Sequence, residues 1–417
     1  MTIKLTPDQK AGLITIRSFL LNPNQKEAIL SGNSGSGKST LVKYIAESLE
    51  DFLKPTAVLL GKPLILRLQL TATTNEAATI LSKSSQNEDV LTVHKLFKLF
   101  FRNNYQTGNK DLVTDKVPFL ENVLIVVDEA SMCNKELRKV IVNNTCKNSK
   151  ILYVGDPEQL DSVNSVCDIF SSDLPEAHLV TNVRQGGNEI ASLGLRFRDA
   201  VLDDKMPILD GISTEHIKYV TGEEFKSLIS DRYTNNKLSS THKVLAYTNE
   251  RVMEYNNYIR EMQNGCSGYV EGEYLTTNKA ITTNNVVIAK NNTLVKISNI
   301  KYMEMHGMNG HQMLVNSDNK TLLGFIPDVP SQAKKAINKL AKKGSWPEMF
   351  ALQDSILDLR PRFASTVHKA QGGTLDEVFI DLNDICETHG TIQSKARALY
   401  VAITRAKQTV YLYGSLI

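Results

Sequence analysis

Short apolar runs alternate with amphipathic stretches through the first part of the chain. Such runs, when polar turns bound them, are typical of strands buried on both faces of a sheet. Here they lie at residues 28–30, 64–70, 123–127 and 151–154. After the first run, Leu41, Val42 and Ile45 lie one helical turn apart, which predicts a helix with one buried face. Strands that alternate with helices predict a parallel α/β sheet.

The same alternation returns in the second part of the chain. We expect strands at residues 244–247, 378–380 and 410–413, beside helical stretches at 249–262 and 393–404. Between them, from 265 to 359, Asn- and Gly-rich turns separate β-like stretches, and a Lys-rich stretch follows at 331–343. That stretch is either a DNA surface or a solvated helix face, with Trp346 anchoring it to the core of the insertion. We therefore predict an α/β protein with two parallel sheets, the second interrupted by a mostly β subdomain with a helical appendage.

Composition narrows the class of protein without naming a partner. The 417 residues favour two to four folding units. A content of 41% hydrophobic and 22% charged residues is typical of a folded globular chain. The formal charge of +3 is too small to indicate a polyanionic partner by itself, so any nucleic-acid surface must be local.

Cysteine usage and hydropathy point to a cytoplasmic location. The five cysteines are far apart and odd in number, without a Cys-x-x-Cys pair, which favours reduced thiols over disulfides or zinc. The N-terminus shows no basic segment followed by an apolar stretch. No run approaches the ~18 apolar residues of a membrane span. We therefore expect no membrane partner.

A glycine-rich loop follows the first predicted strand. Residues 32–39, Gly-Asn-Ser-Gly-Ser-Gly-Lys-Ser, match G-x-x-x-x-G-K-[ST] between a strand and a helix, where loop amides and the helix N-terminus bind phosphate oxygens. Lys38 would meet the β and γ phosphates, Ser39 would offer its hydroxyl to Mg²⁺, and Thr40 could reach the α phosphate. The nucleotide-binding residues expected here are Asn33, Ser34, Gly35, Ser36, Gly37, Lys38, Ser39 and Thr40. The alternative is a glycine turn that only caps a helix, and the motif alone does not separate a motor from a kinase, a GTPase or a transporter ATPase.

Two further strands end in polar side chains. Asp128 and Glu129 directly follow the strand at 123–127, at the edge of a parallel sheet where ligands bind. Asp128 would hold Mg²⁺ and Glu129 would polarise the attacking water. An Asp that caps a helix beside a solvated Glu gives the same pattern. Gln159, after the strand at 151–154, could sense a γ phosphate without adding charge.

Hydrolysis of a phosphate also needs a positively charged side chain beside the transferred phosphoryl group, whose negative charge it stabilises. Arg184 and Arg405 are the candidates, and both lie in the second α/β unit. An arginine supplied by a second unit would make hydrolysis conditional on closure of the two units. Either residue could instead be a surface arginine on a helix.

Short blocks with this chemistry follow one another in a fixed order. They lie at residues 5–9, 32–39, 71–75, 128–129, 155–159, 184, 365–374 and 400–407. In that order they resemble the Q motif and motifs I, Ia, II, III, IV, V and VI of superfamily 1 helicases. The resemblance is to the RecD-like branch and, within it, to the small Dda-type helicases of T4-like bacteriophages. It covers the chain from about residue 5 to the end.

That resemblance implies a domain plan and a function. It implies two RecA-like P-loop domains, at 1–180 with a small pin insertion at about 95–122, and at 181–264 plus 360–417, with an SH3-like β insertion at 265–359. It implies ATP and Mg²⁺ as cofactors, and ATP-dependent 5′–3′ movement on single-stranded DNA with duplex unwinding, in phage replication or recombination. Single-stranded and fork DNA are the implied partners, and single-strand-binding or replication proteins are candidates. We expect a monomer.

The resemblance also assigns roles to individual residues. Gln9 would read the adenine edge, unless it is a solvated helix residue. Catalysis would fall to Lys38, Asp128, Glu129, Gln159, Arg184 and Arg405. DNA would be held by Thr71, Thr73, Thr74, Asn75, His94, Phe100, Phe101, Thr366, His368 and Lys369. Short polar donors suit a grip on the backbone that does not read sequence, and the two phenylalanines could wedge the terminal base pair or pack under a hairpin.

Two other functions fit parts of the pattern. A nucleotide-switched ATPase that remodels DNA-bound proteins would keep the same sites but would need no wedge. A P-loop nucleoside kinase would need neither a second α/β unit nor the block around Arg405, so the length of the chain disfavours it. Unwinding of a tailed duplex separates the helicase from the remodelling ATPase.

Overall fold

The first α/β unit is built on a six-stranded sheet. The computed structural model describes residues 5–60, 66–114, 118–159, 168–181, 183, 189–209, 213–234, 241–283, 286–317 and 320–416. The strand order is β3 (Leu91–Thr92), β2 (Arg67–Ala72), β6 (Val123–Asp128), β7 (Lys150–Gly155), β1 (Glu27–Gly32) and β8 (Glu176–Leu179). All of these pairings are parallel, so the predicted α/β class is confirmed.

Neighbouring residues on the central strands face two separate cores. Leu30 packs with α1 (Pro7–Leu21), α2 (Lys38–Leu60) and α3 (Asn75–Ser85) on one face. Ile29 packs with α4 (Val93–Leu96) and α5 (Lys135–Asn143) on the other. Because both faces are covered, these strands read as continuous apolar runs. Among the helices of the described residues, none is long and apolar enough to cross a bilayer.

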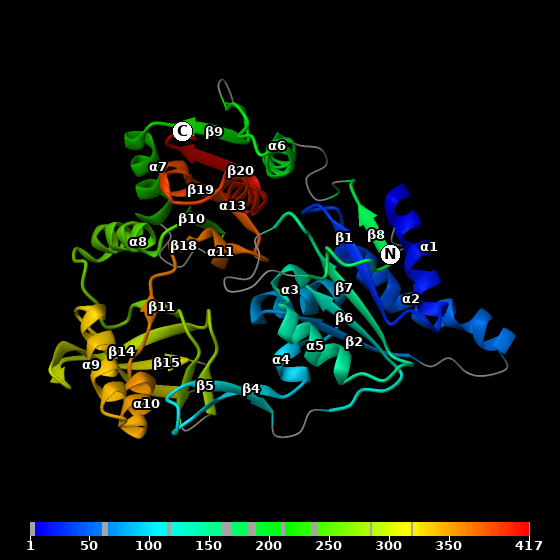
Figure 1. Cartoon of the computed structure of the whole chain (residues 1–417). Helices are drawn as coiled ribbons and strands as arrows, with labels where there is room; N and C mark the ends of the chain where they lie inside the picture. The colour runs from blue at the N-terminus through cyan, green and yellow to red at the C-terminus, as the bar shows by residue number, and fades with distance from the viewer. Residues whose placement is uncertain are drawn as a thin grey trace.

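The second α/β unit repeats this plan around a five-stranded parallel sheet. Its order is β18 (Ala364–Thr366), β10 (His242–Ala246), β19 (Leu375–Asp381), β20 (Ala406–Tyr413) and β9 (Ile217–Val220). One face packs on α6 (Glu189–Asp203), α11 (Val367–Ala370), α12 (Leu382–Glu387) and α13 (Ile392–Thr404). The other face packs on α7 (Gly222–Thr234) and α8 (Asn249–Asn264). The two sheets form separate bodies, as Figure 1 shows.

The insertion in the second unit is an antiparallel sheet with two helices. Its order is β16 (Lys320–Pro327), β15 (Met308–Ser317), β14 (Leu294–Met305), β11 (Tyr274–Thr277) and β17 (Leu359–Arg360), and β12 (Ile281–Thr283) pairs with β13 (Val286–Ala289). Helices α9 (Pro330–Lys342) and α10 (Trp346–Ser355) pack on it through Ala333 and Leu352 against Phe325. The Lys-rich stretch therefore lies largely on α9, where its lysines are exposed.

A hairpin of the first unit reaches across to this insertion. Strands β4 (Leu99–Asn103) and β5 (Lys110–Thr114) pair antiparallel, and Figure 1 shows them running from the first unit to α10. At the tip, the ring of Tyr105 meets Phe350 edge to face, with centroids 5.3 Å apart, and Lys110 Nζ lies 3.6 Å from Asp354 Oδ1. Gly108 has φ +73°, and its missing side chain leaves room for the ring of Trp346. Two units far apart in sequence are thus joined at the hairpin tip.

Several sequence predictions need correction at the edges of the sheets. The short strands β3, β8 and β9 were absent from the prediction, because they are brief and polar on one side, as the alternating burial of β8 illustrates. The ring of Trp346 lies against Gly108 of the hairpin, a contact that the sequence did not predict, and its anchoring to the core of the insertion stays a prediction. We keep the predicted domain boundaries as a proposal.

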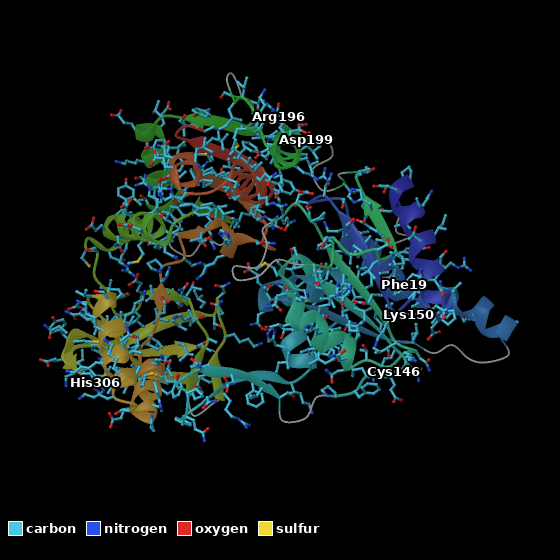
Figure 2. The ribbon with its side chains drawn as sticks, viewed as in Figure 1. Phe19, Cys146, Lys150, Arg196, Asp199 and His306 are labelled. Carbon is cyan, nitrogen blue, oxygen red and sulfur yellow. The ribbon has the colours of Figure 1, made fainter. Side chains whose placement is uncertain are left out.

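The end of α1 is fastened to the first sheet. Lys150, at the start of β7, donates its ammonium to the carbonyl oxygens of Asn22 and Gln25. The same ammonium lies 5.1 Å from the centre of the Phe19 ring, a cation–π contact. Figure 2 labels Lys150 and Phe19 close together at this end of the unit. Helix α1, which carries Gln9, is therefore fixed to the sheet at its far end.

A buried ion pair at the junction of the second unit and its insertion gives a test of stability. Arg260 of α8 donates from Nε to Glu273 Oε1 at 2.8 Å, and the two side chains are 4% and 9% exposed. In Arg260→Met, the Glu273 carboxylate loses its partner while buried, so we expect about 3–5 kcal/mol of destabilisation. The midpoint of urea unfolding should fall accordingly. Lys54→Met, which removes an exposed pair with Asp51, is the control and should leave the midpoint in place; equal midpoints for both variants would contradict the expectation.

Candidate functional site

The glycine-rich loop turns sharply between β1 and α2. Gly35 and Gly37 have φ of +81° and +82°, a region that favours glycine. Behind the loop, Gln9 Nε2 donates to the carbonyl oxygens of Ser36 at 3.1 Å and Gly37 at 3.4 Å, and its Oε1 accepts from the amide of Thr6 at 3.0 Å. Both ends of the Gln9 amide therefore support the loop. Its reading of an adenine edge stays a prediction.

One pocket gathers most of the residues predicted to handle the nucleotide. Its lining includes Ser34, Gly35, Gly37, Lys38, Ser39, Thr40, Asp128, Glu129, Gln159 and Arg405. Asn33 and Ser36 are buried, and the Asn33 side chain donates to the carbonyl oxygen of Val180 at 3.4 Å. Asn33 and Ser36 therefore shape the loop from inside.

Lys38 lies along the curve of the loop. Its Nζ donates to the carbonyl oxygens of Gly32 at 2.7 Å and Asn33 at 3.0 Å. An ammonium has three donors and no acceptor, so a phosphate oxygen would compete with these carbonyls for it. The ammonium is therefore within the pocket where phosphate would lie.

Strand β6 delivers two carboxylates to the same pocket. Asp128 Oδ1 accepts from the amide of Glu129 at 3.0 Å. Glu129 has φ +52° and ψ +46°, a left-handed conformation that costs a residue with a side chain ~1 kcal/mol or more. Burial, and then the neighbouring Glu129, raise the pKa of Asp128 to about 7. A cation bound here would favour the ionised form of Asp128.

The second unit closes the pocket with Arg405, and Gln371 contacts Gln159, one of the residues that line it. Arg405 is 3% exposed, and its guanidinium donates to Val401 O and to Gly373 O, each at 3.1 Å. Gln371 Nε2 donates to Gln159 Oε1 at 3.2 Å. Arg184 lies outside the described residues. The pocket therefore has walls from both α/β units.

A groove of about 370 Å³ opens beside the nucleotide pocket. Three parts of the chain line it: Thr73, Thr74, Asn75, Glu76, Thr92 and His94 of the first unit, His368, Lys369 and Gln371 of the second, and Asn291 and Asn292 of the insertion. Glu129 lines both the groove and the nucleotide pocket. Most residues predicted to hold DNA therefore come together, directly next to the acidic end of β6.

The groove offers neutral donors more than charge. Burial lowers the pKa of His94 and of His368, so both imidazoles are neutral at pH 7. Burial also raises the pKa of Glu76, whose Oε2 accepts from Asn292 Nδ2 at 3.2 Å across the groove. Lys369 is the cation among the described lining residues. This character suits contacts to a phosphate backbone through hydrogen bonds.

Four residues predicted to hold DNA lie elsewhere or cannot be placed. Thr71 is fully buried, and its hydroxyl donates to Val126 O at 2.7 Å, so it holds β2 to β6. Thr366 caps α11 and lines a neighbouring cavity. Phe100 is on β4 beneath the guanidinium of Arg102, 5.4 Å away. The side chain of Phe101 lies outside the described part of the chain.

Sequence reasoning missed several residues that complete the site. Asn292 joins the groove from a turn 216 residues away from Glu76, and a turn-forming Asn pair carries no signal of that position. Gln371 and Tyr400 lie inside the blocks at 365–374 and 400–407, so their place in the series was a usable signal. Asp156, which is 1% exposed, lies inside the block at 155–159, where Gln159 alone was predicted to act.

Two known families match this chain, one in each α/β unit. The family described as "AAA domain" matches residues 20–165, and the family described as "UvrD-like helicase C-terminal domain" matches residues 361–413. The first range holds the glycine-rich loop, Asp128 and Glu129, and the second holds Gln371 and Arg405. Each half of the nucleotide pocket thus matches its own family.

Relatives match the chain over nearly its whole length. The protein named "ATP-dependent DNA helicase dda" from Enterobacteria phage T4 is 23% identical, with 98% of this chain and 98% of that protein covered. An uncharacterized protein, R530, from Acanthamoeba polyphaga mimivirus is 23% identical, with coverage of 94% and 96%. Among solved structures, a Pif1 helicase from Bacteroides with ADP-AlF3 and ssDNA has a TM-score of 0.45 at 14% identity, covering 100% of this chain and 94% of that one. The two family matches fall on the two halves of one pocket, and the phage relative is matched from end to end, so this chain is similar to that helicase in both α/β units.

Proposed function

We propose that this chain uses ATP hydrolysis to move 5′–3′ along single-stranded DNA and to unwind duplex DNA. The observation that carries the proposal is the position of Glu129, which lines both the nucleotide pocket and the groove. One residue can therefore respond to a phosphate on one side and to a DNA strand on the other. The direction of movement rests on the order of the motifs and on their resemblance to the RecD-like branch.

In this proposal, each catalytic side chain has one task. Lys38 and the loop amides bind the phosphates, and Glu129 polarises the attacking water. Gln159 lies against the γ phosphate, and Arg405 places positive charge on the transferred group. Because Arg405 belongs to the second unit, hydrolysis depends on the two units being closed. Arg184 would share this task.

Ser39 and Asp128 would hold Mg²⁺ with the nucleotide. Both residues line the pocket, and a hydroxyl with one carboxylate fits an ion that takes its other ligands from phosphate and water. The described residues contain no group of three or more acidic, His or Cys side chains that could hold a metal ion, which agrees with such a shared site. Bound Mg²⁺ would neutralise part of the phosphate charge.

The groove would hold a single strand between the two units. Thr73, Thr74 and Asn75 would grip it on the first unit, and His368 and Lys369 on the second. Closure around ATP and opening after hydrolysis would let one grip release while the other holds, which moves the strand stepwise. Neutral hydrogen-bond donors permit such release more readily than a continuous row of cations.

The hairpin β4–β5 would act as the pin that separates the strands. The tip of the hairpin is held by α10 through Tyr105, Gly108 and Lys110. A duplex pressed against the hairpin would therefore meet a pin that is supported at both ends. We further propose that the chain acts as a monomer in the cytoplasm of a phage host, in replication or recombination, with single-strand-binding or replication proteins as partners. Relatives from phage T4 and mimivirus support a viral setting.

Lys38→Ala should abolish ATP turnover and spare DNA binding. The ammonium stabilises the phosphates but lines no part of the groove, so we expect kcat to fall by ~100-fold or more. Affinity for a fluorescent oligothymidine should stay near the wild-type value. Lys54→Ala, an exposed lysine of the same helix, is the matched control. Near-normal turnover in Lys38→Ala would contradict the assigned pocket.

Two tailed duplexes test the direction of movement. With ATP and Mg²⁺, we expect the enzyme to displace the strand of a duplex that carries a 5′ single-stranded tail, and to leave the duplex with a 3′ tail paired. Displacement is followed by a fluorophore and quencher pair. Unwinding from the 3′ tail alone would reverse the polarity. Turnover without unwinding of either substrate would favour the remodelling ATPase.

Release of the hairpin tip should uncouple turnover from unwinding. The double variant Tyr105→Ala/Trp346→Ala removes the aromatic contacts to α10, each worth ~1 kcal/mol. We expect unwinding to slow by about tenfold, while ATP turnover on a single strand stays within about twofold. Tyr302→Ala removes an exposed tyrosine of the same insertion and should unwind normally. Equal loss of turnover and unwinding would argue against a pin.

A further inference from the structure

A chain of hydrogen bonds leads from the groove to the nucleotide pocket. It begins at Gln371, which lines the groove beside Lys369. Gln371 Nε2 donates to Gln159 Oε1 at 3.2 Å, and Gln159 Nε2 lies 3.4 Å from Asp156 Oδ2, which accepts from it. Gln159 is 4% exposed and Asp156 is 1% exposed, so water has little access to these contacts. If DNA moved the Gln371 side chain, the hydrogen bonds through Gln159 would therefore move the Asp156 carboxylate as well.

Tyr400 continues this chain into the glycine-rich loop. Its hydroxyl donates to Asp156 Oδ2 at 2.6 Å and accepts from the amide of Ser34 at 2.8 Å. The side chain belongs to α13 of the second unit, whereas Asp156 and Ser34 belong to the first. Tyr400 therefore ties the two units together at the loop that is expected to bind phosphate.

The direction of the hydrogen bond to Asp156 is fixed by protonation. Burial, and then Asp156 itself, raise the pKa of Tyr400 well above its ordinary value, so the hydroxyl keeps its proton at any working pH. The Tyr400 hydroxyl must therefore donate its proton to the Asp156 carboxylate, and the lone pairs of the hydroxyl oxygen then accept from the Ser34 amide. A phenyl ring in its place would leave the amide and the carboxylate without that partner.

A second residue of α13 holds the same turn. Arg397 Nη1 donates to Pro157 O at 2.8 Å and to Gln159 O at 3.0 Å, and its Nη2 lies 3.6 Å from Glu158 Oε2. Asp156 Oδ1 also accepts from the amide of Glu158 at 3.1 Å. The turn at residues 156–159 is thus held as one piece against α13, and cannot move without moving the tyrosine.

We propose that Tyr400 is a positioning residue through which DNA in the groove controls ATP turnover. This role rests on the proposed helicase function and goes beyond it. A strand that shifts Gln371 shifts Gln159 and Asp156, and Tyr400 carries the shift to the loop amide of Ser34. The loop and Gln159 then reach their catalytic positions together. The alternative is that Tyr400 only stabilises the contact between the units.

The test compares Tyr400→Phe with wild type by ATP turnover with and without saturating oligothymidine. We expect the ratio of DNA-stimulated to unstimulated kcat to fall by about tenfold, which lies within the range of couplings between two sites. The KM for ATP should change by less than about threefold, because the ring still fills its space. Asp156→Asn should lower the same ratio, since it weakens the next bond of the chain.

A matched control and a double variant separate coupling from stability. Tyr233→Phe also removes a buried tyrosine hydroxyl, but one that donates to Phe363 O inside the second unit, so its ratio should equal that of wild type. Tyr400 and Gln371 belong to the same chain of hydrogen bonds, so in Tyr400→Phe/Gln371→Met the ratio of DNA-stimulated to unstimulated kcat should fall no further than in the more affected single variant. If the two residues acted independently, the two fold-losses in this ratio would multiply. Multiplying losses, or turnover that falls equally with and without DNA, would overturn the role of Tyr400 alone. A wild-type enzyme that DNA fails to stimulate would overturn the proposed function as well.

Discussion

Two parallel sheets must face each other at their carboxyl ends for this site to exist. The first sheet supplies the glycine-rich loop after β1 and the two carboxylates after β6. The second unit supplies Arg405, which is buried in the pocket, and Gln371, which is partly buried and donates to Gln159. Neither edge is a complete phosphate site, because one lacks the arginine and the other lacks the loop. Catalysis in such a molecule depends on how the two units approach, and that dependence is what allows hydrolysis to produce movement.

Because the pocket is complete only when the two units meet around a nucleotide, its residues are under electrostatic and backbone strain without one. Burial disfavours the charged form of Asp128 and the neighbouring Glu129 carboxylate adds repulsion, so the pKa of Asp128 is raised. Both carboxylates would also repel phosphates. The left-handed turn at Glu129 adds a conformational cost at the same point. A nucleotide with its metal ion, together with the cations Lys38 and Arg405, would relieve the repulsion. The closed arrangement is therefore favoured by the nucleotide, and loses that support once the phosphate leaves.

The sequence was most informative where one interaction decides the structure. Continuous apolar runs predicted the central strands, because burial on both faces leaves no alternative composition. The order of the motifs predicted which strand ends meet, as the pocket around Lys38, Asp128 and Arg405 illustrates. The sequence did not predict other contacts between residues that are far apart along the chain. Nothing local reveals that Asn292 crosses to Glu76, or that Trp346 lies on the hairpin at Gly108. Thr71 shows the converse error, since its motif is correct but its hydroxyl is buried in the sheet.

Charge along the proposed DNA path is uneven, although the net charge of the chain is only +3. The groove beside the nucleotide pocket is lined by hydroxyls, amides, neutral histidines and two carboxyl groups, and Lys369 is the cation among its described lining residues. The adjoining cavity is lined by all three parts of the chain. Within the part of the chain that the structure describes, the first unit contributes one cation, Lys83, beside Glu76, whereas the second unit and its insertion contribute six: Lys243, Lys290, Arg360, Arg362, Lys369 and Lys407. Each phosphate neutralised by a cation adds affinity that depends on salt, whereas contacts to neutral donors add little. A strand would thus be held more firmly by the second unit and its insertion than by the first unit. A motor needs such a difference, because the unit with the weaker grip can slide along the strand while the other holds it.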